Sequence, residues 1–355
     1  MNNNDKFSIN VLMKRKVFIL FVSTFLCLLI FAGLFNYLID PYGRYGTDIL
    51  NMNRIDPRSW IVNNLKNQTK EPQLLLFGSS RCINLHVDHI PNIHGINVAL
   101  FAGAIEDHYC ILRYAVEDLS YPIKYIVLGL EPDLMTNAHP IDTMLRRNEI
   151  LNRWLEKSEQ APVQFGLTAP DYVKDLSSLL SLKTLMDSLR VLAKFLIKSL
   201  NLREATAAEV PLDHKKEDVS WLQKIVDKKD SMEARLRQYK KLYSGATQID
   251  AARQRYLYRL ADFAQKRGIK VIMFYPGYSM EFWQQMCKIT VFKKMHEGLD
   301  LHIQELVQKY EWDVIDFRPT YWKDPKLEYF DGVHPTRDTV KIIDNTIGDL
   351  VKRDF

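Results

Sequence analysis

Apolar positions along the chain follow two patterns, which are short, largely apolar runs and longer stretches with helical spacing. The short runs predict five strands, at residues 74–77, 96–100, 124–128, 269–275 and 312–317. Apolar residues recur at steps of three and four in the helices that we expect between them, at residues 105–119, at 249–263 and from Thr336 onward. Buried strands that alternate with helices are typical of a parallel sheet covered on both faces. We therefore predict a three-layer α/β domain.

The longest uncharged stretch precedes this domain. Residues 17–35 carry no charge and would form a helix of about 28 Å, close to the thickness of the hydrocarbon core. No small-residue cleavage site follows, so we predict an uncleaved transmembrane anchor rather than a signal peptide. The basic cluster at residues 14–16 precedes the span. We therefore expect a cytoplasmic N-terminus and export of everything from about residue 40 onward, in a single-pass membrane protein.

This pattern divides the chain into four parts. They are a cytoplasmic tail at residues 1–16, the anchor at 17–39, a linker at 40–70 and the α/β domain at 71–355. Residues 135–245 contain helical runs and no convincing strand, and we interpret them as a helical insertion between the third and fourth strands. The very apolar segment 191–197 lies inside this insertion and either packs in a core or touches the bilayer; we predict that it packs in a core.

Composition narrows the function. Lys and Arg number 48 against 43 Asp and Glu, and the excess of +5 is spread along the chain without the dense basic stripe of nucleic-acid binders. The four cysteines lack the paired short spacings of a zinc site and are too few for a disulfide scaffold. His86, His89 and His94 lie close in sequence, but solvated loop histidines are the interpretation that we favour. We predict no metal, no other cofactor and no nucleic-acid partner.

Two motifs carry candidate chemistry. Residues 74–81 (LLLFGSSR) predict a strand that ends in a turn bearing a small hydroxyl side chain, and ligands of open α/β sheets bind outside the carboxyl ends of strands. In residues 330–336 (FDGVHPT), Asp331 can hold Nδ1 of His334 while Nε2 points elsewhere. Each motif alone is also compatible with an ordinary turn. In a parallel sheet, however, both motifs reach the same edge although about 250 residues separate them.

The two motifs together resemble the SGNH, or GDSL-like, hydrolases. Residues 78–80 (GSS) match the first block of this family and residues 331–335 (DGVHP) match its fifth, within a resemblance that covers residues 70–134 and 245–355. The resemblance implies a flavodoxin-like fold of the SGNH hydrolase type. It also implies that Ser80 is the nucleophile.

Further roles follow from the same resemblance. His334 would be the general base and Asp331 its orienting partner. The backbone amides of Ser80 and Gly103 would form the oxyanion hole, and Gly103 looks like the glycine of the second block.

The third block departs from the family pattern. Gly-x-Asn-Asp appears here as residues 129–132 (GLEP), without the asparagine that would be a third oxyanion donor, and Asn137 is a nearby asparagine that we cannot place. Arg81 follows the serine directly. We consider two roles for Arg81, binding of an anionic part of a substrate and pairing with Glu131 or Asp133 at the sheet edge.

The anchor, residues 40–43 (DPYG) and the Gly-Ser-Ser turn together resemble the membrane-anchored SGNH-like proteins of bacterial envelope-polymer acylation. That group includes the alginate O-acetylation proteins and the teichoic-acid D-alanyl-transfer protein, which work beside a multipass membrane acyltransferase. The resemblance implies a serine acyl-esterase or O-acyltransferase whose partners are an envelope glycan or acyl donor and such an acyltransferase. The alternatives are a non-catalytic assembly partner with the same fold and an esterase for small or lipid substrates.

Overall fold

The computed structural model describes residues 3–45, 47, 49–50, 56–101, 103–136, 143–158, 169–201, 231–246, 248–322 and 326–353. The chain divides into two compact units, one formed by Met1–Asp56 with Gly166–Val210 and the other by Pro57–Phe165 with Pro211–Phe355. The predicted linker and helical insertion are thus each divided between the two units. Helix α2 (Pro57–Lys66), at the end of the predicted linker, belongs to the second unit.

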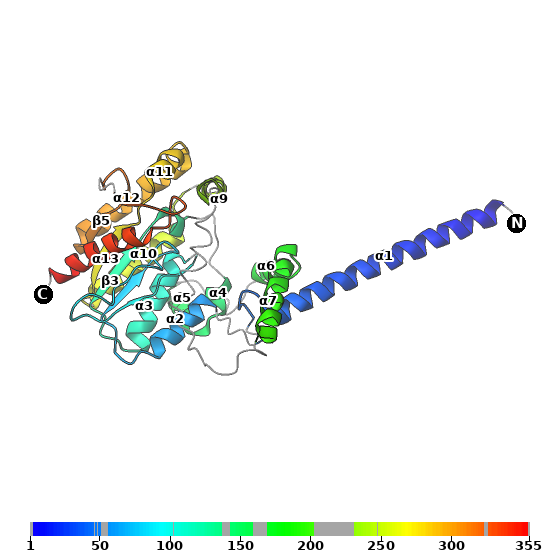
Figure 1. Ribbon diagram of the computed structural model, residues 1–355, viewed down its shortest axis with the longest axis horizontal. Helices are drawn as coiled ribbons and strands as arrows, with labels where there is room; N and C mark the ends of the chain where they lie inside the picture. The colour runs from blue at the N-terminus through cyan, green and yellow to red at the C-terminus, as the bar shows by residue number, and fades with distance from the viewer. Residues whose placement is uncertain are drawn as a thin grey trace. The chain divides into compact units, whose positions relative to one another are not determined.

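The second unit contains a five-stranded parallel sheet in the order β2-β1-β3-β4-β5, which confirms the predicted α/β fold (Figure 1). Its strands are β1 (Leu74–Phe77), β2 (Gly95–Asn97), β3 (Tyr125–Gly129), β4 (Lys270–Tyr275) and β5 (Asp313–Asp316). In the register of the central strands, Ile126 lies beside Leu75 on one side and Val271 on the other. Every carboxyl end therefore reaches one edge of the sheet.

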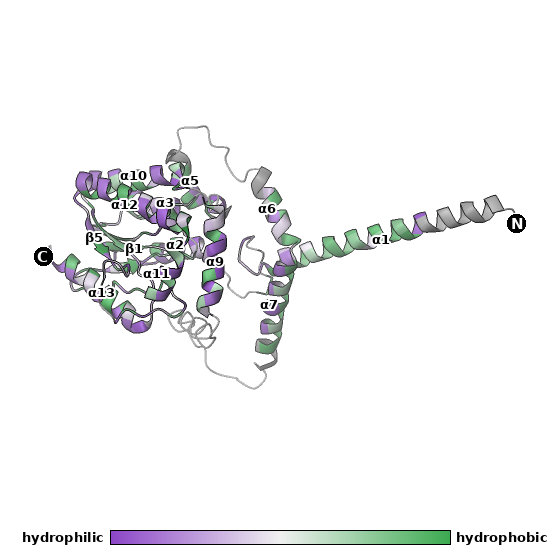
Figure 2. Cartoon of the chain, turned by 90° about the horizontal axis from the view of Figure 1, so that it is seen from above, coloured by the Kyte–Doolittle hydropathy of each residue, from purple (hydrophilic) through white to green (hydrophobic). Residues whose placement is uncertain are grey.

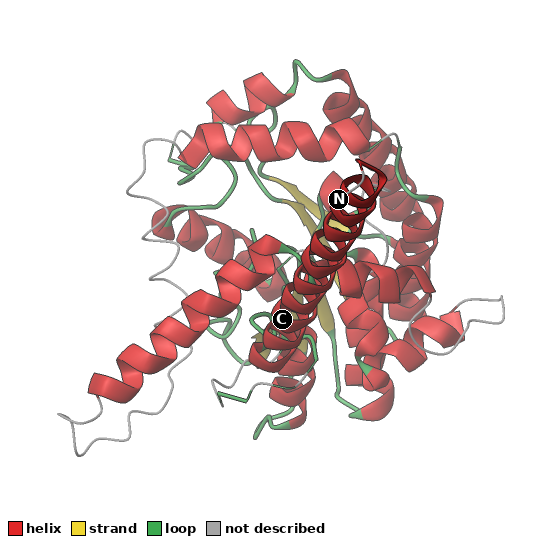
Figure 3. Cartoon of the chain, turned by 90° about the vertical axis from the view of Figure 1, so that its right-hand side faces the viewer, coloured by secondary structure: helices red, strands yellow, loops and turns green. Residues whose placement is uncertain are grey.

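Helices surround this sheet (Figure 3). Besides α2 they are α3 (Ile105–Arg113), the π-helix η1 (Tyr114–Asp118), the 3-10 helix η2 (Pro132–Leu134), α4 (Thr143–Arg147), α5 (Glu149–Ser158), α9 (Ser231–Gly245), α10 (Ala251–Lys266), α11 (Met280–Met286), α12 (Thr290–Tyr310) and α13 (Arg337–Lys352). Asp250 caps the start of α10, and Gly268, with a φ of +65°, follows its end, as glycine commonly does after a helix.

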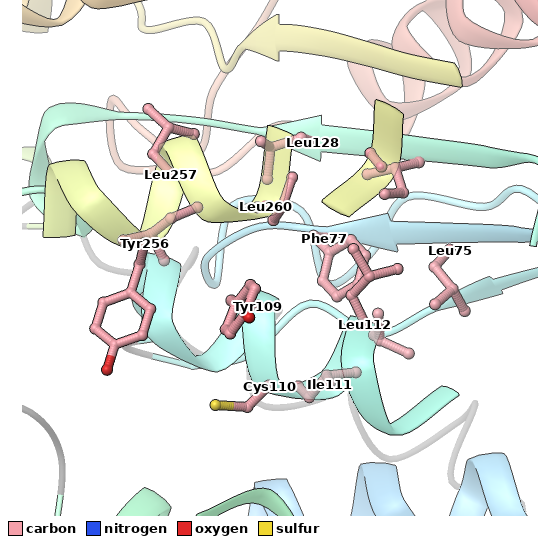
Figure 4. Close-up of a cluster of buried hydrophobic side chains, with 14 of the residues drawn as sticks. Leu75, Phe77, Tyr109, Cys110, Ile111, Leu112, Leu128, Tyr256, Leu257 and Leu260 are labelled. Atoms are coloured by element: carbon pink, nitrogen blue, oxygen red, sulfur yellow. The ribbon is translucent and has the colours of Figure 1, made fainter. Parts of the chain in front are cut away.

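Alternate residues of the central strands β1, β3 and β4 enter separate cores on the two faces of the sheet. Leu75 and Phe77 pack with apolar residues of α2, α3, α10 and α12, and Figure 4 shows part of this cluster. Leu74 and Leu76 pack on the opposite face with α13 and the segment that follows β1. Because side chains alternate between the faces of a strand, burial on both faces requires the continuous apolar runs seen in the sequence.

The described part of the first unit contains the helices α1 (Asn3–Ile39), α6 (Ala169–Leu179) and α7 (Leu182–Asn201), and the described residues that follow α1. Within α1, Arg15–Ile39 is long and apolar enough to cross a membrane. The prediction that residues 191–197 pack in a core is wrong for Leu196 and Ile197, which are 49% and 58% exposed. These residues lie on α7 in the small first unit, whose described residues contain no sheet for them to pack against.

We expect the centre of the sheet to dominate stability. Ile126 is fully buried in the middle of β3, and Ile126→Ala should lower the free energy of unfolding by about 2–5 kcal/mol, because it removes buried methyl groups and leaves a cavity. Val314 on edge strand β5 is 38% exposed, and Val314→Ala should cost under about 1 kcal/mol. Urea unfolding of the detergent-solubilised protein, followed by tryptophan fluorescence, measures both values. Equal losses would contradict this ranking.

Candidate active site

The turn after β1 presents Ser80 at the carboxyl edge of the sheet. A Cβ atom on Gly78 would lie 2.3 Å from Sγ of Cys82, so only glycine allows this close approach of the turn to the side chain behind it. The amide of Cys82 donates to the carbonyl of Ser79 at 2.9 Å and closes the turn. Ser80 is half-buried. Its hydroxyl points away from this turn, toward the loop that precedes α13.

The structure brings Ser80, His334 and Asp331 together. Oγ of Ser80 lies 3.1 Å from Nε2 of His334, and Nδ1 of His334 lies 2.9 Å from Oδ2 of Asp331. The other carboxylate oxygen, Oδ1 of Asp331, accepts from the backbone amides of Val333 and His334 at 3.2 and 3.0 Å. With the proton on Nδ1 shared with Asp331, Nε2 is the free acceptor for the serine hydroxyl. This arrangement can activate a serine for nucleophilic attack.

A glycine makes the loop of His334 possible. Gly332 has a φ of +91°, and a Cβ atom there would lie 2.7 Å from the Phe282 ring. Both the backbone angle and the contact exclude a larger residue. The tight turn lets Asp331 cap the amides of the loop and orient the imidazole at the same time.

Sequence reasoning missed Arg235. This residue of α9 donates to Oδ2 of Asp331 from Nε at 2.8 Å, and Nη2 lies 2.7 Å from the same oxygen. Burial alone would raise the pKa of Asp331, but the hydrogen bond and charge of His334 and the charge of Arg235 hold it well below its usual range. Asp331 is therefore ionised at every pH at which enzymes ordinarily work. No motif marks Arg235, which is one of several arginines in a predicted helix.

Arg81 lies beneath the site instead of facing a ligand. Arg81 is only 3% exposed. Its Nη1 pairs with the carboxylate of Glu131, its Nη2 donates to the carbonyl of Gly277, and its Nε donates to the carbonyl of Val333 at 3.2 Å. The Tyr278 ring covers the guanidinium at 4.0 Å. Of the two roles considered for Arg81, the structure has the pairing with Glu131. The guanidinium is buried among these protein partners.

Glu131 occupies the third-block position where the family has asparagine. Its carboxylate accepts from Oγ of Ser79 and from Arg81, and it is 2% exposed. An ionised carboxylate only accepts hydrogen bonds, so Glu131 cannot donate to an oxyanion. Asn137 lies outside the described residues.

Gly103 is the other predicted oxyanion donor. Its amide donates to the carbonyl of Leu100 at 3.2 Å and so closes a turn after β2. A Cβ atom at this position would meet Cβ of Leu100 at 2.8 Å. An oxyanion would therefore have to share the amide of Gly103 with this turn bond or displace it.

Asp133 completes the charged network. Burial and then the charge of the neighbouring Glu131 raise the pKa of Asp133 to about 7, although its hydrogen bond from the Tyr243 hydroxyl favours the ionised form. Below this pH the carboxyl of Asp133 is mostly neutral. Glu131 is then the carboxylate that balances the charge of Arg81. Below about pH 7, Arg81 and Glu131 therefore form an ion pair without net charge beneath Ser80.

The described part of the chain contains no cluster of side chains suited to bind a metal ion. No group of three or more His, Cys, Asp or Glu side chains there could hold a metal ion. His86, His89 and His94 belong to that part, so they do not form such a group.

Comparison with known proteins gives only remote likenesses. No family model matches the sequence, and no curated protein matches it significantly. A "putative acylhydrolase" from Bacteroides fragilis is 13% identical, with a TM-score of 0.37 and coverage of 86% of this chain and 98% of that one. A GDSL-like lipase from Bacteroides thetaiotaomicron is 12% identical, with a TM-score of 0.38 and coverage of 84% and 98%. Likenesses this distant carry no argument about activity, which rests on the geometry above.

The ion pair between Arg81 and Glu131 should be critical for stability. Glu131→Gln leaves a buried cation without its counter-ion and should lower the free energy of unfolding by about 3 kcal/mol or more in urea unfolding. The matched control is Glu233→Gln, which removes an exposed pair with Arg237 at 3.5 Å and should cost under about 0.5 kcal/mol. A Glu131→Gln protein as stable as the control would refute a structural role for the pair.

Arg235 should tune the pH dependence of Ser80 reactivity. Arg235→Gln removes a cation that contacts the same Asp331 oxygen as the imidazole, so Asp331 should then stabilise a positive charge on the imidazole more strongly. We expect the acid limb of the rate of Ser80 labelling by a fluorophosphonate to move upward by about one pH unit or less. Arg237→Gln, on the same helix but paired with Glu233, is the control and should leave the profile in place. An unmoved profile in the Arg235 variant would exclude this electrostatic role.

Proposed function

We propose that this chain is a membrane-anchored serine acyl-esterase or O-acyltransferase of the SGNH type, which acts on acyl esters of a cell-envelope carbohydrate. One observation carries the proposal, namely the chain of contacts from Oγ of Ser80 through both ring nitrogens of His334 to Asp331. The spacing of 3.1 and 2.9 Å is that of a nucleophile, its base and the orienting acid.

The chemistry would proceed in two acyl-transfer steps. His334 accepts the proton of Ser80 at Nε2 while Oγ attacks the acyl carbonyl and forms a tetrahedral intermediate. Collapse breaks the bond to the leaving oxygen, which takes the proton back from Nε2 and departs as an alcohol. Water, or a sugar hydroxyl, then loses its proton to Nε2 and attacks the acyl-serine, and the proton returns to Oγ of Ser80 as the acid or new ester leaves.

Stabilisation of the oxyanion is the weakest part of the proposed machinery. Each backbone amide aimed at a developing oxyanion stabilises the transition state by about 3 kcal/mol. Glu131, however, supplies no third donor, and the amide of Gly103 already donates to the carbonyl of Leu100. This observation favours a second candidate function, a non-catalytic partner that keeps the fold and assists a multipass membrane acyltransferase. The preserved contact between Ser80 and His334 supports the catalytic proposal over this one.

Membrane anchoring enters the proposal through α1. Its segment Arg15–Ile39 has the length and hydropathy of a membrane span. The basic residues that precede this segment support a cytoplasmic N-terminus and an exported catalytic unit. An envelope glycan as acceptor, and an acyltransferase as partner, follow from the family resemblance and are part of this proposal.

Fluorophosphonate labelling of the full-length protein in detergent tests the catalytic proposal. We expect covalent modification at Ser80, abolished in Ser80→Ala and reduced by about 10³-fold or more in His334→Ala, because the hydroxyl then lacks its base. Ser79→Ala is the matched control, because the Ser79 hydroxyl donates to Glu131 and not to the imidazole; it should still be labelled.

Absence of labelling in a folded wild-type protein would reject the enzyme in favour of the assembly partner. If Ser80 is labelled, release of acetate from O-acetylated polysaccharide, compared with release from lipid esters, identifies the substrate class. Preference for lipid esters would overturn the carbohydrate assignment.

A further inference from the structure

Helix α7 carries three distinct stripes. At 100° per residue, side chains that recur at steps of three and four share one face. The exposed apolar stripe contains Leu182, Met186, Leu189, Leu196 and Ile197. The charged stripe contains Lys183, Asp187, Arg190 and Lys194. The third stripe, which faces inward, contains the buried Thr184 and Ser188 and the half-buried Val191 and Phe195.

Helix α6 repeats this division on a smaller scale. It buries Asp175, and the exposed apolar residues of α6 and the turn after it are Tyr172, Val173, Leu176 and Leu180. Figure 2 shows the mixed hydropathy of both helices. Together the two helices, here called the α6–α7 hairpin, expose large apolar side chains in stripes, whereas isolated exposed apolar residues are the norm on water-facing helices.

The hairpin is attached where the predicted membrane span ends. Nδ2 of Asn36 donates to the carbonyl of Leu179 at 2.6 Å, and Asn36 is itself fully buried. A Cβ atom on Gly33 would lie 3.1 Å from Cδ2 of Leu180, so a glycine of α1 gives the hairpin room for close approach. Both views in Figures 1 and 2 show α7 lying across the end of α1 instead of along it. A helix in that position lies in the membrane plane if α1 crosses the bilayer.

Two contacts show at which level along the axis of α1 each side of the hairpin lies. Leu180 lies beside Gly33, six residues inside the end of the span at Ile39, which is a depth of about 9 Å. Asp187, on the charged stripe, accepts from the Tyr42 hydroxyl at 2.7 Å, beyond that end. The apolar side of the hairpin therefore lies at the level of the span and the charged side beyond it. Interfacial helices typically bury their apolar face about 5–10 Å deep, which agrees with this placement.

We propose that the α6–α7 hairpin is an interfacial membrane element whose exposed apolar stripes rest in the lipid of the non-cytoplasmic leaflet. The occupant of this surface is thus the bilayer itself, and not a second copy of the chain. The lysines and arginine of the charged stripe then face water and the anionic headgroups. This inference rests on the proposed membrane insertion of α1. It adds that residues more than 130 positions further along the chain are also bound to the membrane.

Site-directed spin labelling of the full chain in phosphatidylcholine–phosphatidylglycerol vesicles tests the proposal. The labelled variants are Met186→Cys on the apolar stripe and Lys194→Cys on the charged stripe, both with Cys27→Ser and Cys287→Ser. Burial raises the pKa of the remaining thiols, Cys82 and Cys110, and makes them unreactive. Power saturation with oxygen, which enriches in lipid, and with a water-soluble nickel chelate reports the surroundings of each label.

We expect the ratio of oxygen to nickel accessibility to be several-fold higher at position 186 than at 194. Equal ratios, with both labels open to nickel, would overturn the proposal. So would a label at 186 that neither reagent reaches, which would indicate a protein cover, either the other unit or a second copy. A label on the native Cys27, with Cys287→Ser, is the control for the anchor. Nickel access at Cys27 would reject insertion of α1, whereas a lipid-facing Cys27 with a water-facing 186 would reject the hairpin alone.

Discussion

One buried guanidinium holds the candidate active site together. Arg81 follows the nucleophile turn after β1, pairs with Glu131 after β3, donates to the carbonyl of Gly277 after β4 and donates to that of Val333, next to His334. It therefore joins the loops at three strand ends to the loop of the base. A buried arginine can do this because its five donors spread in a fixed plane, and because Glu131 compensates the cost of burying its charge.

The contacts of Ser80 depend on that frame and on two glycines. Gly78 lets the turn approach Cys82, and Gly332 lets the loop of His334 approach Phe282. With both loops held, a serine and a histidine 254 positions apart come within hydrogen-bond distance. The same frame gives Glu131 its place: its carboxylate neutralises the charge of Arg81.

The first unit follows a different physical rule. Its helices α1, α6 and α7 have little interior, and polar contacts such as those of Asn36 and Tyr42 hold them to one another. Large apolar side chains remain on the outside. In water such a surface is unfavourable, so the arrangement makes sense only where another apolar medium covers it. The proposed anchor and the proposed interfacial hairpin are in this sense one element.

The sequence by itself determined the strands, three of the helices around them (α3, α10 and α13) and the two motifs at the sheet edge, because apolar periodicity and turn residues act over a few neighbouring positions. It also predicted that Ser80 and His334 approach each other, since a parallel sheet aligns its strand ends. Only the tertiary structure decided the rest. The burial of Arg81 and the contact of Arg235 with Asp331 depend on partners far along the chain. Burial and pairing are properties of three-dimensional packing, which local periodicity does not encode.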